Sequence, residues 1–280
     1  AGCYVPAGRF PLLSSVIMTV TPAVAAGVGE VIMCTPPRVH PDDVPEASKS
    51  GAGVPGKAFV GGKPYADEGV MAAAYICGVN HLYAVGGSQA IGAMAYGTDS
   101  IPKVDVIVGP GNKYVATAKK LVYGKVGIDM IAGPTEVMII ADESANPKWV
   151  AADLLAQAEH DNVAQPILVT NNMELAEKVS IEIEEQLDTL TTKATARQSI
   201  DNYGLIIIAD SLEQAAEIAN KKAPEHLELA LEQGEERTKL ESLVHNYGSL
   251  FIGHYSAEVY GDYAAGLNHT LPTSGAAKYT

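Results

Sequence analysis

Short apolar segments rich in β-branched residues alternate along this chain with longer, alanine-rich segments. The short segments predict strands, and the longer ones, with their helical spacing of apolar positions, predict helices. Strands that alternate with helices in this way are typical of parallel α/β sheets. We expect strands over 31–34, 81–85, 104–108, 137–141, 166–170, 205–209 and 249–253, and helices over 11–26, 66–77, 89–97, 113–123, 147–160, 172–189, 211–222 and 234–245.

The pattern is interrupted near 129–133, where the sequence IDMIAGP separates two βαβ-like halves. We therefore expect an α/β protein of two incomplete Rossmann-like domains with parallel-type sheets, one over 1–132 and the other over 133–280. The segment 38–68 is rich in Pro, Gly, Ser and charge and predicts a long surface excursion. The chain begins without methionine and stops after a Gly/Ala segment, so we interpret it as part of a longer polypeptide.

Composition narrows the class of protein. The chain has 280 residues, of which 47% are hydrophobic and 19% charged, as expected of a globular protein with a sizeable core. Its formal net charge of −14 argues against nucleic-acid or anionic-membrane partners but leaves room for a small ligand. No long apolar segment or signal peptide is evident. The 3 cysteines lack metal-ligand spacing, and we expect reduced thiols in a cytoplasmic protein.

Two glycine-rich turns, 86–89 and 109–112, follow predicted strands and open predicted helices. Glycine allows backbone N–H groups to approach a ligand, and a helix N-terminus favours negative charge. Neither turn has the GxGxxG fingerprint of dinucleotide-binding proteins. Tight connections without any ligand explain these turns equally well.

Polar residues in the second half suggest a reactive site. Gln157 and His160 are three residues apart on a predicted helix and share one of its faces, so they can converge on one ion. The simpler interpretation is that His160 is a capping or core histidine. Glu225 and His226 follow a proline, where they either handle protons or simply begin a helix. Asp262, in a glycine-punctuated polar turn with His269, is a possible oxygen ligand.

Taken in order, several segments of the chain resemble the histidinol dehydrogenase family. They are Tyr4-Val-Pro, VGGSQAIGA, VGPGNKYV, AGPTEV, DLLAQAEH, APEHLEL and GDYAAGLNHTLPTSG. The resemblance implies an oxidoreductase of histidine biosynthesis that oxidises L-histidinol through L-histidinaldehyde to L-histidine while reducing two NAD molecules. It implies NAD and Zn²⁺ as cofactors, with NAD bound in the domain over 1–132 and zinc and catalysis in the domain over 133–280.

The resemblance also assigns roles to individual residues. It implies that NAD is contacted by Tyr4, Gln89 and Asn112, and that zinc is held by Gln157, His160 and Asp262. It implies that Glu225 and His226 transfer protons, with His226 drawing the hydroxyl proton and Glu225 helping water attack the aldehyde. The residues implied to bind substrate are Thr135, Gln157, His160, His226, Asp262 and His269.

Two features depart from the family. Its remaining zinc ligand, a histidine, and a substrate-binding glutamate belong to a C-terminal segment that crosses to the partner subunit of a homodimer, and this chain lacks that segment. The segment 38–68 is also longer than we expect. Two alternatives therefore stay open: a related zinc- and NAD-dependent dehydrogenase of another small polyol, such as 2,3-dihydroxypropane-1-sulfonate, and an inactive α/β ligand-binding module.

Overall fold

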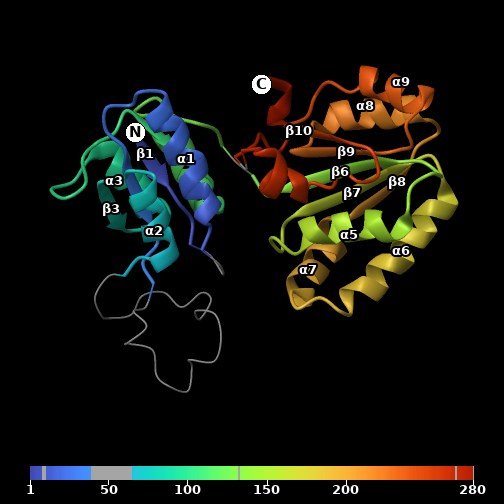
Figure 1. The fold of residues 1–280 in the computed structure, drawn as a ribbon, viewed down its shortest axis with the longest axis horizontal. Coiled ribbons are helices and arrows are strands. Elements are labelled where there is room, and N and C mark those ends of the chain that lie inside the picture. The colour runs from blue at the N-terminus through green and yellow to red at the C-terminus, as the bar shows by residue number, and fades with distance from the viewer. Residues whose placement is uncertain (8–10, 39–64, 132, 269, 280) are drawn as a thin grey trace. The chain divides into compact units, whose positions relative to one another are not determined.

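The computed structural model describes residues 1–7, 11–38, 65–131, 133–268 and 270–279, without the side chains of residues 262 and 263 (Figure 1). The chain divides into two compact units, Ala1–Ile131 and Ala132–Thr280. Each has its own parallel sheet, five-stranded within the described residues, with helices on both faces. The expected α/β class with parallel-type sheets is confirmed. Most of the predicted excursion over 38–68 lies outside the described residues.

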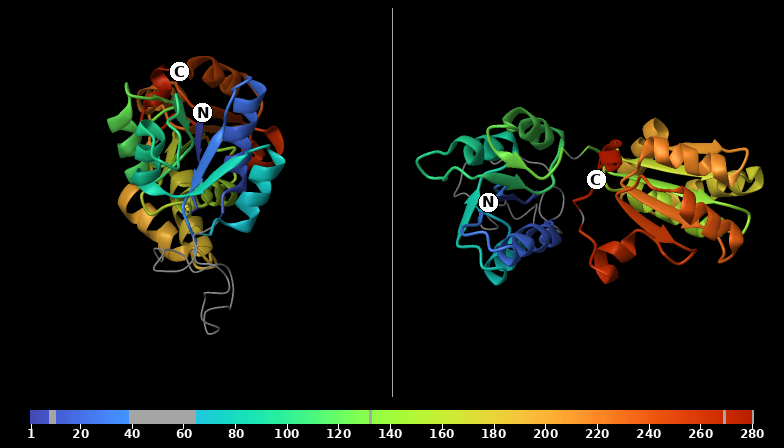
Figure 2. Two further views of the ribbon diagram at one scale, coloured as in Figure 1. Left: turned by 90° about the vertical axis from the view of Figure 1, so that its left-hand side faces the viewer. Right: turned by 90° about the horizontal axis from the view of Figure 1, so that it is seen from above.

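The sheet of the first unit has the order β3-β2-β1-β4-β5, and its paired strands are all parallel. Helices α1 and α2 pack on one face and α3 and α4 on the other (Figure 2). The strands are β1 (Gly2–Tyr4), β2 (Ile32–Thr35), β3 (His81–Ala84), β4 (Val106–Val108) and β5 (Gly127–Ile128), and the helices are α1 (Leu13–Ala25), α2 (Glu68–Ile76), α3 (Gly87–Tyr96) and α4 (Lys113–Val122).

The sheet of the second unit has the order β10-β9-β6-β7-β8, again with parallel pairs. Helices α5, α6 and α7 cover one face and α8 and α9 the other (Figure 1). The strands are β6 (Glu136–Ala141), β7 (Gln165–Thr170), β8 (Leu205–Ile208), β9 (His226–Ala230) and β10 (Ser249–Ile252), and the helices are α5 (Pro147–Ala158), α6 (Met173–Leu187), α7 (Lys193–Tyr203), α8 (Leu212–Lys222) and α9 (Glu235–Leu243).

Strand β6 shows why a continuous apolar segment forms a strand here. All its residues are buried, because helices cover both faces of a parallel sheet. Val137 and Ile139 pack in the cluster with α5, α6 and α7, whereas Met138 and Ile140 pack in the cluster with α8 and α9. This alternation follows from the two-residue period of a strand.

Four elements differ from the sequence-based expectation, and one of them is the three-residue β1, which is not among the expected strands. Glu225 and His226 do not begin a helix, because residues 226–230 form β9, which pairs with β6 and β10. The alternation in His-Leu-Glu-Leu-Ala places two leucines on one face and two polar residues on the other, as a strand does. Helix α7 was not predicted, since it has few apolar residues, and the two-residue β5 is too short to give a pattern.

No helix in the described part of the chain is long and apolar enough to cross a membrane.

Candidate active site

Four of the predicted site residues form one chain of hydrogen bonds in the second unit. The Nδ1 atom of His226 lies 3.3 Å from the amide oxygen of Gln157. The amide nitrogen of Gln157 donates to the hydroxyl of Thr135 at 2.9 Å. That hydroxyl donates to the carboxylate of Glu225 at 2.6 Å, and the same oxygen accepts from the backbone N–H of Glu136 at 3.1 Å. Every link has a donor on one side and an acceptor on the other.

The topology explains this meeting. Strand β9 lies beside β6 with His226 opposite Val137, so Glu225 and Thr135, which precede the two strands, also lie side by side. Helix α5 returns antiparallel to β6 and brings Gln157, near its C-terminus, over the beginnings of the strands. The site therefore lies at the amino ends of the strands. In open parallel sheets, ligands usually bind at the carboxyl ends.

Four oxygen atoms surround Nδ1 of His226. Besides Gln157, they are the carbonyl oxygen of Glu136 at 3.3 Å, a carboxylate oxygen of Glu258 at 3.5 Å and one of Glu225 at 3.8 Å. Each of these atoms accepts hydrogen bonds. The network therefore favours the tautomer that carries its proton on Nδ1, which leaves the basic lone pair on Nε2. The imidazole is only 7% exposed, and this fixes its orientation.

A buried ion pair supports the start of β6. Glu136 is fully buried, pairs with Lys222 at the end of α8, and accepts from the backbone N–H of Ser274 at 2.9 Å. The nearby Gly133 donates its N–H to the Thr273 hydroxyl. These contacts hold the segment before β6 against the segment 273–274, so the backbone around Thr135 is held on both sides.

Sequence reasoning missed three carboxyl groups beside this site, those of Glu258, Glu228 and Asp153. Glu228 follows His226 by two residues and points to the same face of β9, and Asp153 precedes Gln157 by one helical turn. The buried Glu228 carboxylate accepts from the backbone N–H of Glu258 at 2.9 Å. Burial raises the pKa of Asp153 to about 6, and burial, with the nearby Asp153 and Glu258, raises that of Glu228 well above its usual range. The sequence signal that could have found two of them is their spacing: Glu228 lies two residues after His226 on a strand, and Asp153 lies four residues before Gln157 on a helix.

Of the other expected zinc and substrate residues, only His160 is fully described. His160 is exposed in the turn that follows α5, and its N–H bonds to the carbonyl of Gln157. The backbone of Asp262 belongs to a short π-helix, Gly261–Ala265, but its side chain is outside the described part, and so is His269. No three His, Cys, Asp or Glu side chains in the described ranges form a metal-binding group. The expected set is a nitrogen donor and two oxygen donors, which suits zinc chemically.

In the first unit, Tyr4 connects the two glycine-rich turns. It is 2% exposed, and its hydroxyl accepts from the N–H of Gly87 at 3.1 Å. Its backbone oxygen lies so close to Gly109 that an added Cβ would approach it to 2.1 Å. Gly109 has φ +117°, which only glycine adopts readily. Burial raises the pKa of the Tyr4 phenol.

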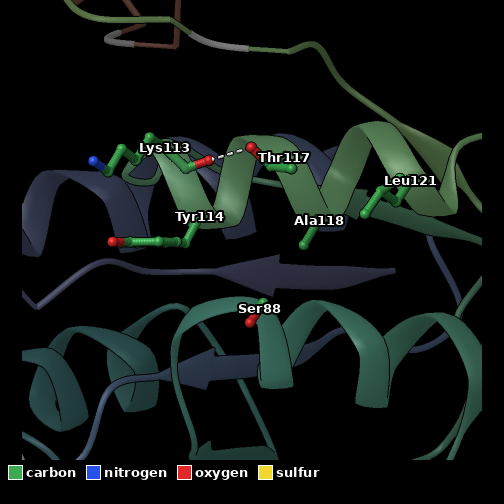
Figure 3. A pocket seen from close by; sticks show the side chains of 6 residues that line it. All are labelled: Ser88, Lys113, Tyr114, Thr117, Ala118 and Leu121. Carbon is green, nitrogen blue, oxygen red and sulfur yellow. Dashed lines mark hydrogen bonds between the residues drawn. The ribbon is translucent and has the colours of Figure 1, made fainter.

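A pocket of about 400 Å³ lies between the helices that follow these turns. It is lined mainly by apolar atoms; Figure 3 shows Ser88 of α3 across from the α4 side chains Lys113, Tyr114, Thr117, Ala118 and Leu121. Gln89 and Asn112, both exposed, adjoin two of these lining residues in the sequence.

The two helix starts that flank the pocket are capped differently. The amide oxygen of Asn112 caps α4 by accepting from Tyr114 N and Val115 N, which leaves its amide nitrogen to donate elsewhere. The N-cap residue of α3, Gly86, has no side chain to cap the helix, and the N–H of Gly87 donates to the Tyr4 hydroxyl. The next N–H groups of the first turn, those of Ser88 and Gln89, can face an anionic ligand.

Comparison with known proteins finds relatives along the whole length of this chain. The family model described as histidinol dehydrogenase matches residues 1–280. The histidinol dehydrogenase of Streptococcus mutans is 51% identical over 279 residues, and that of a Synechococcus strain is 50% identical over 279 residues. The alignments cover 100% of this chain but only 59% and 58% of those relatives.

A solved structure is similar throughout. The crystal structure of histidinol dehydrogenase from Elizabethkingia anophelis has a TM-score of 0.85 and 40% identity, covering 99% of this chain and 58% of that one.

Proposed function

This chain belongs to the histidinol dehydrogenase family, and we propose that its protein oxidises L-histidinol through L-histidinaldehyde to L-histidine, reducing two NAD molecules. The observation that carries this proposal is the hydrogen-bond chain from His226 through Gln157 and Thr135 to Glu225. It holds an imidazole with a defined basic nitrogen close to a buried carboxylate. A four-electron oxidation of an alcohol to an acid releases protons from the alcohol hydroxyl and from the added water, and an imidazole and a carboxylate can each accept such a proton.

The chain's residues divide the proton transfers between them. Nε2 of His226 accepts the hydroxyl proton in the first oxidation, because Nδ1 is engaged with surrounding oxygens. Glu225 accepts a proton from the water that adds to the aldehyde. The hydroxyl of Thr135 and the backbone N–H of Glu136 both donate to its carboxylate and so fix its orientation.

Zinc and NAD supply the chemistry that side chains cannot. When bound, NAD takes a hydride in each oxidation, and zinc polarises and orients the substrate without redox chemistry of its own. We assign zinc to Gln157, His160 and Asp262, and NAD to Tyr4, Gln89 and Asn112. Tyr4 is buried, and its hydroxyl accepts from the N–H of Gly87, so it orders that turn in addition to its assigned contact with NAD.

The two units have separate roles in this proposal. The unit Ala1–Ile131 binds NAD, in line with the uncapped start of α3 beside the pocket, and the unit Ala132–Thr280 binds zinc and substrate. The substrate role of His269, the homodimer with exchanged tails and the cytoplasmic location stay predictions.

The test uses the full-length protein with zinc, histidinol and NAD. We expect two NADH for each histidinol consumed. His226→Asn should slow turnover by roughly 10²–10⁴-fold with histidinol. Glu225→Gln should chiefly slow the second oxidation, that of histidinaldehyde. His245→Asn, at an exposed histidine, serves as the matched control.

Single-turnover measurements that start from alcohol and from aldehyde separate the two roles. Equal slowing of both steps by both variants would overturn the division between His226 and Glu225. Oxidation of 2,3-dihydroxypropane-1-sulfonate but not histidinol would favour the related polyol dehydrogenase. Failure to turn over either substrate with zinc and NAD bound would favour the inactive binding module.

A further inference from the structure

A buried ion pair holds one glycine of the first unit by both of its backbone groups. Lys119 of α4 is 2% exposed and pairs with Asp129. Its Nζ also donates to the carbonyl oxygen of Gly109 at 3.0 Å. The other carboxylate oxygen of Asp129 accepts the N–H of Gly109 at 2.7 Å. The C=O and the N–H of Gly109 thus both end on the same ion pair.

The ends of the pair come from elements that are themselves fixed. Lys119 lies in the last turn of α4. Asp129 directly follows β5 and donates its own N–H to the carbonyl oxygen of Ile107 in β4 at 3.2 Å. Gly109 directly follows β4 and begins the turn that leads to Asn112. On its other side it lies against the backbone of Tyr4. The turn is therefore held from the helix, from the sheet edge and from the central strand.

Stability alone is a weak reason for such an arrangement. Removing a lysine and a carboxylate from water costs several kcal/mol per ion, and well-packed apolar residues often stabilise a fold as much or more. A charged clamp is more informative where it fixes geometry, since hydrogen bonds to charged groups are short and directional. Here the fixed geometry is that of the turn beside the pocket between α3 and α4.

We propose that Lys119 and Asp129 are positioning residues for the cofactor: by holding both polar groups of Gly109, they set the turn 109–112 in the conformation that presents Asn112 to NAD. The inference rests on the proposed NAD site. Lys119 is too deeply buried beneath the turn to touch the cofactor. The two carboxylate oxygens of Asp129 are engaged by Lys119 and by the N–H of Gly109. Pre-organisation of this kind improves binding because the loop does not have to be ordered when the ligand arrives.

The test compares two variants of the full chain in NAD titrations by calorimetry. Lys119→Met combined with Asp129→Asn removes both charges and the donor to the Gly109 carbonyl while keeping an oxygen near its N–H. We expect NAD to bind about tenfold or more weakly, with zinc affinity unchanged. Val16→Ala, in the α1 layer on the opposite face of the sheet, is the control that lowers stability without touching the turn.

Both variants are titrated well below their melting temperatures, with circular dichroism to verify that they are folded. The control should keep NAD affinity within about twofold, since independent sites are nearly additive. In the catalysed reaction, the double variant Lys119→Met, Asp129→Asn (the clamp variant) should show a raised KM for NAD, with kcat little changed at saturation.

The outcomes separate the two proposals. If the unsubstituted chain does not bind NAD, the proposed cofactor site fails. If the unsubstituted chain binds NAD and the folded clamp variant binds it equally well, the positioning role is wrong. Equal weakening in the clamp variant and in Val16→Ala would assign Lys119 and Asp129 to stability only.

Discussion

At the scale of single residues, Thr135 decides the direction of the hydrogen-bond chain. Its hydroxyl accepts from Gln157 and donates to Glu225, so only a side chain with both capacities can join these groups. Serine and threonine meet this requirement, whereas valine has the same shape but would remove the acceptor of the buried Gln157 amide nitrogen and one of the donors to the Glu225 carboxylate. This is a physical reason for the hydroxyl residue in AGPTEV.

The carboxyl group of the single residue Asp153 makes the free energy of unfolding depend on pH. Burial raises the pKa of its carboxyl group to about 6, whereas an unfolded aspartate titrates near 3.9. Between these values the folded state keeps a proton that the unfolded state has lost, so the free energy of unfolding falls as pH rises. Asp153→Asn removes this penalty. We expect the variant to gain on the order of 2 kcal/mol relative to the parent between about pH 4 and 7.

Urea unfolding over this pH series measures the effect. Asp188→Asn is the control with the opposite sign: a hydrogen bond from Lys193 lowers the pKa of the exposed Asp188, so its small contribution is present at neutral pH and lost as pH falls. Parallel pH profiles for Asp153→Asn and the parent would show that the Asp153 carboxyl is not raised.

At the scale of elements, β9 has two tasks on its two faces. Leu227 and Leu229 pack in the core under α8 and α9, while His226 and Glu228 point to the opposite face. A single buried strand therefore fixes the imidazole of His226 and a carboxyl group that accepts a hydrogen bond from the backbone of Glu258. Because β9 is paired on both sides, His226 has little freedom to shift.

A pair of identical substitutions tests this position in the sheet. Leu227→Ala on β9 should lower the free energy of unfolding by about 2–5 kcal/mol, because the side chain is fully buried. Leu205→Ala on the edge strand β8 should cost less than about 1 kcal/mol, since that side chain is 54% exposed. Chemical denaturation of both variants gives the comparison. Equal losses would contradict the buried placement of β9.

At the scale of the whole molecule, the proposed roles predict that the unit Ala1–Ile131 binds NAD and that the unit Ala132–Thr280 binds zinc and substrate. Hydrogen exchange can test this. We expect NAD to slow exchange in the turns 86–89 and 109–112 of the first unit, because ligand contacts protect backbone N–H groups. We expect zinc with histidinol to slow exchange around 133–136 and 225–228 in the second unit. Mass spectrometry of peptic fragments resolves these segments.

The control for this experiment is the segment 173–187, in α6, which should exchange equally in all samples. Protection of the first unit by zinc alone, or of the second unit by NAD alone, would contradict the division of roles.

The sequence by itself determined the class of the fold and most of its elements. Apolar segments such as 137–141 predict buried strands because helices on both faces demand apolar side chains throughout, and the alternation with helices predicts parallel sheets. Local pattern also named Gln157, Glu225 and His226 as candidates, with a structural interpretation open beside each, and the family resemblance assigned their roles.

Only the tertiary structure decided how these residues meet. His226, directly after Glu225, became the first residue of a strand because pairing with β6 and β10 outweighs the helix-starting character of Pro-Glu-His. The structure also placed Gln157 and Thr135, 22 residues apart, within hydrogen-bond reach, and Lys119 beneath Gly109. Such contacts depend on strand order and on the return of α5 and α4 over their sheets. Local periodicity carries no record of that order, since each segment has the same pattern whichever strand lies beside it.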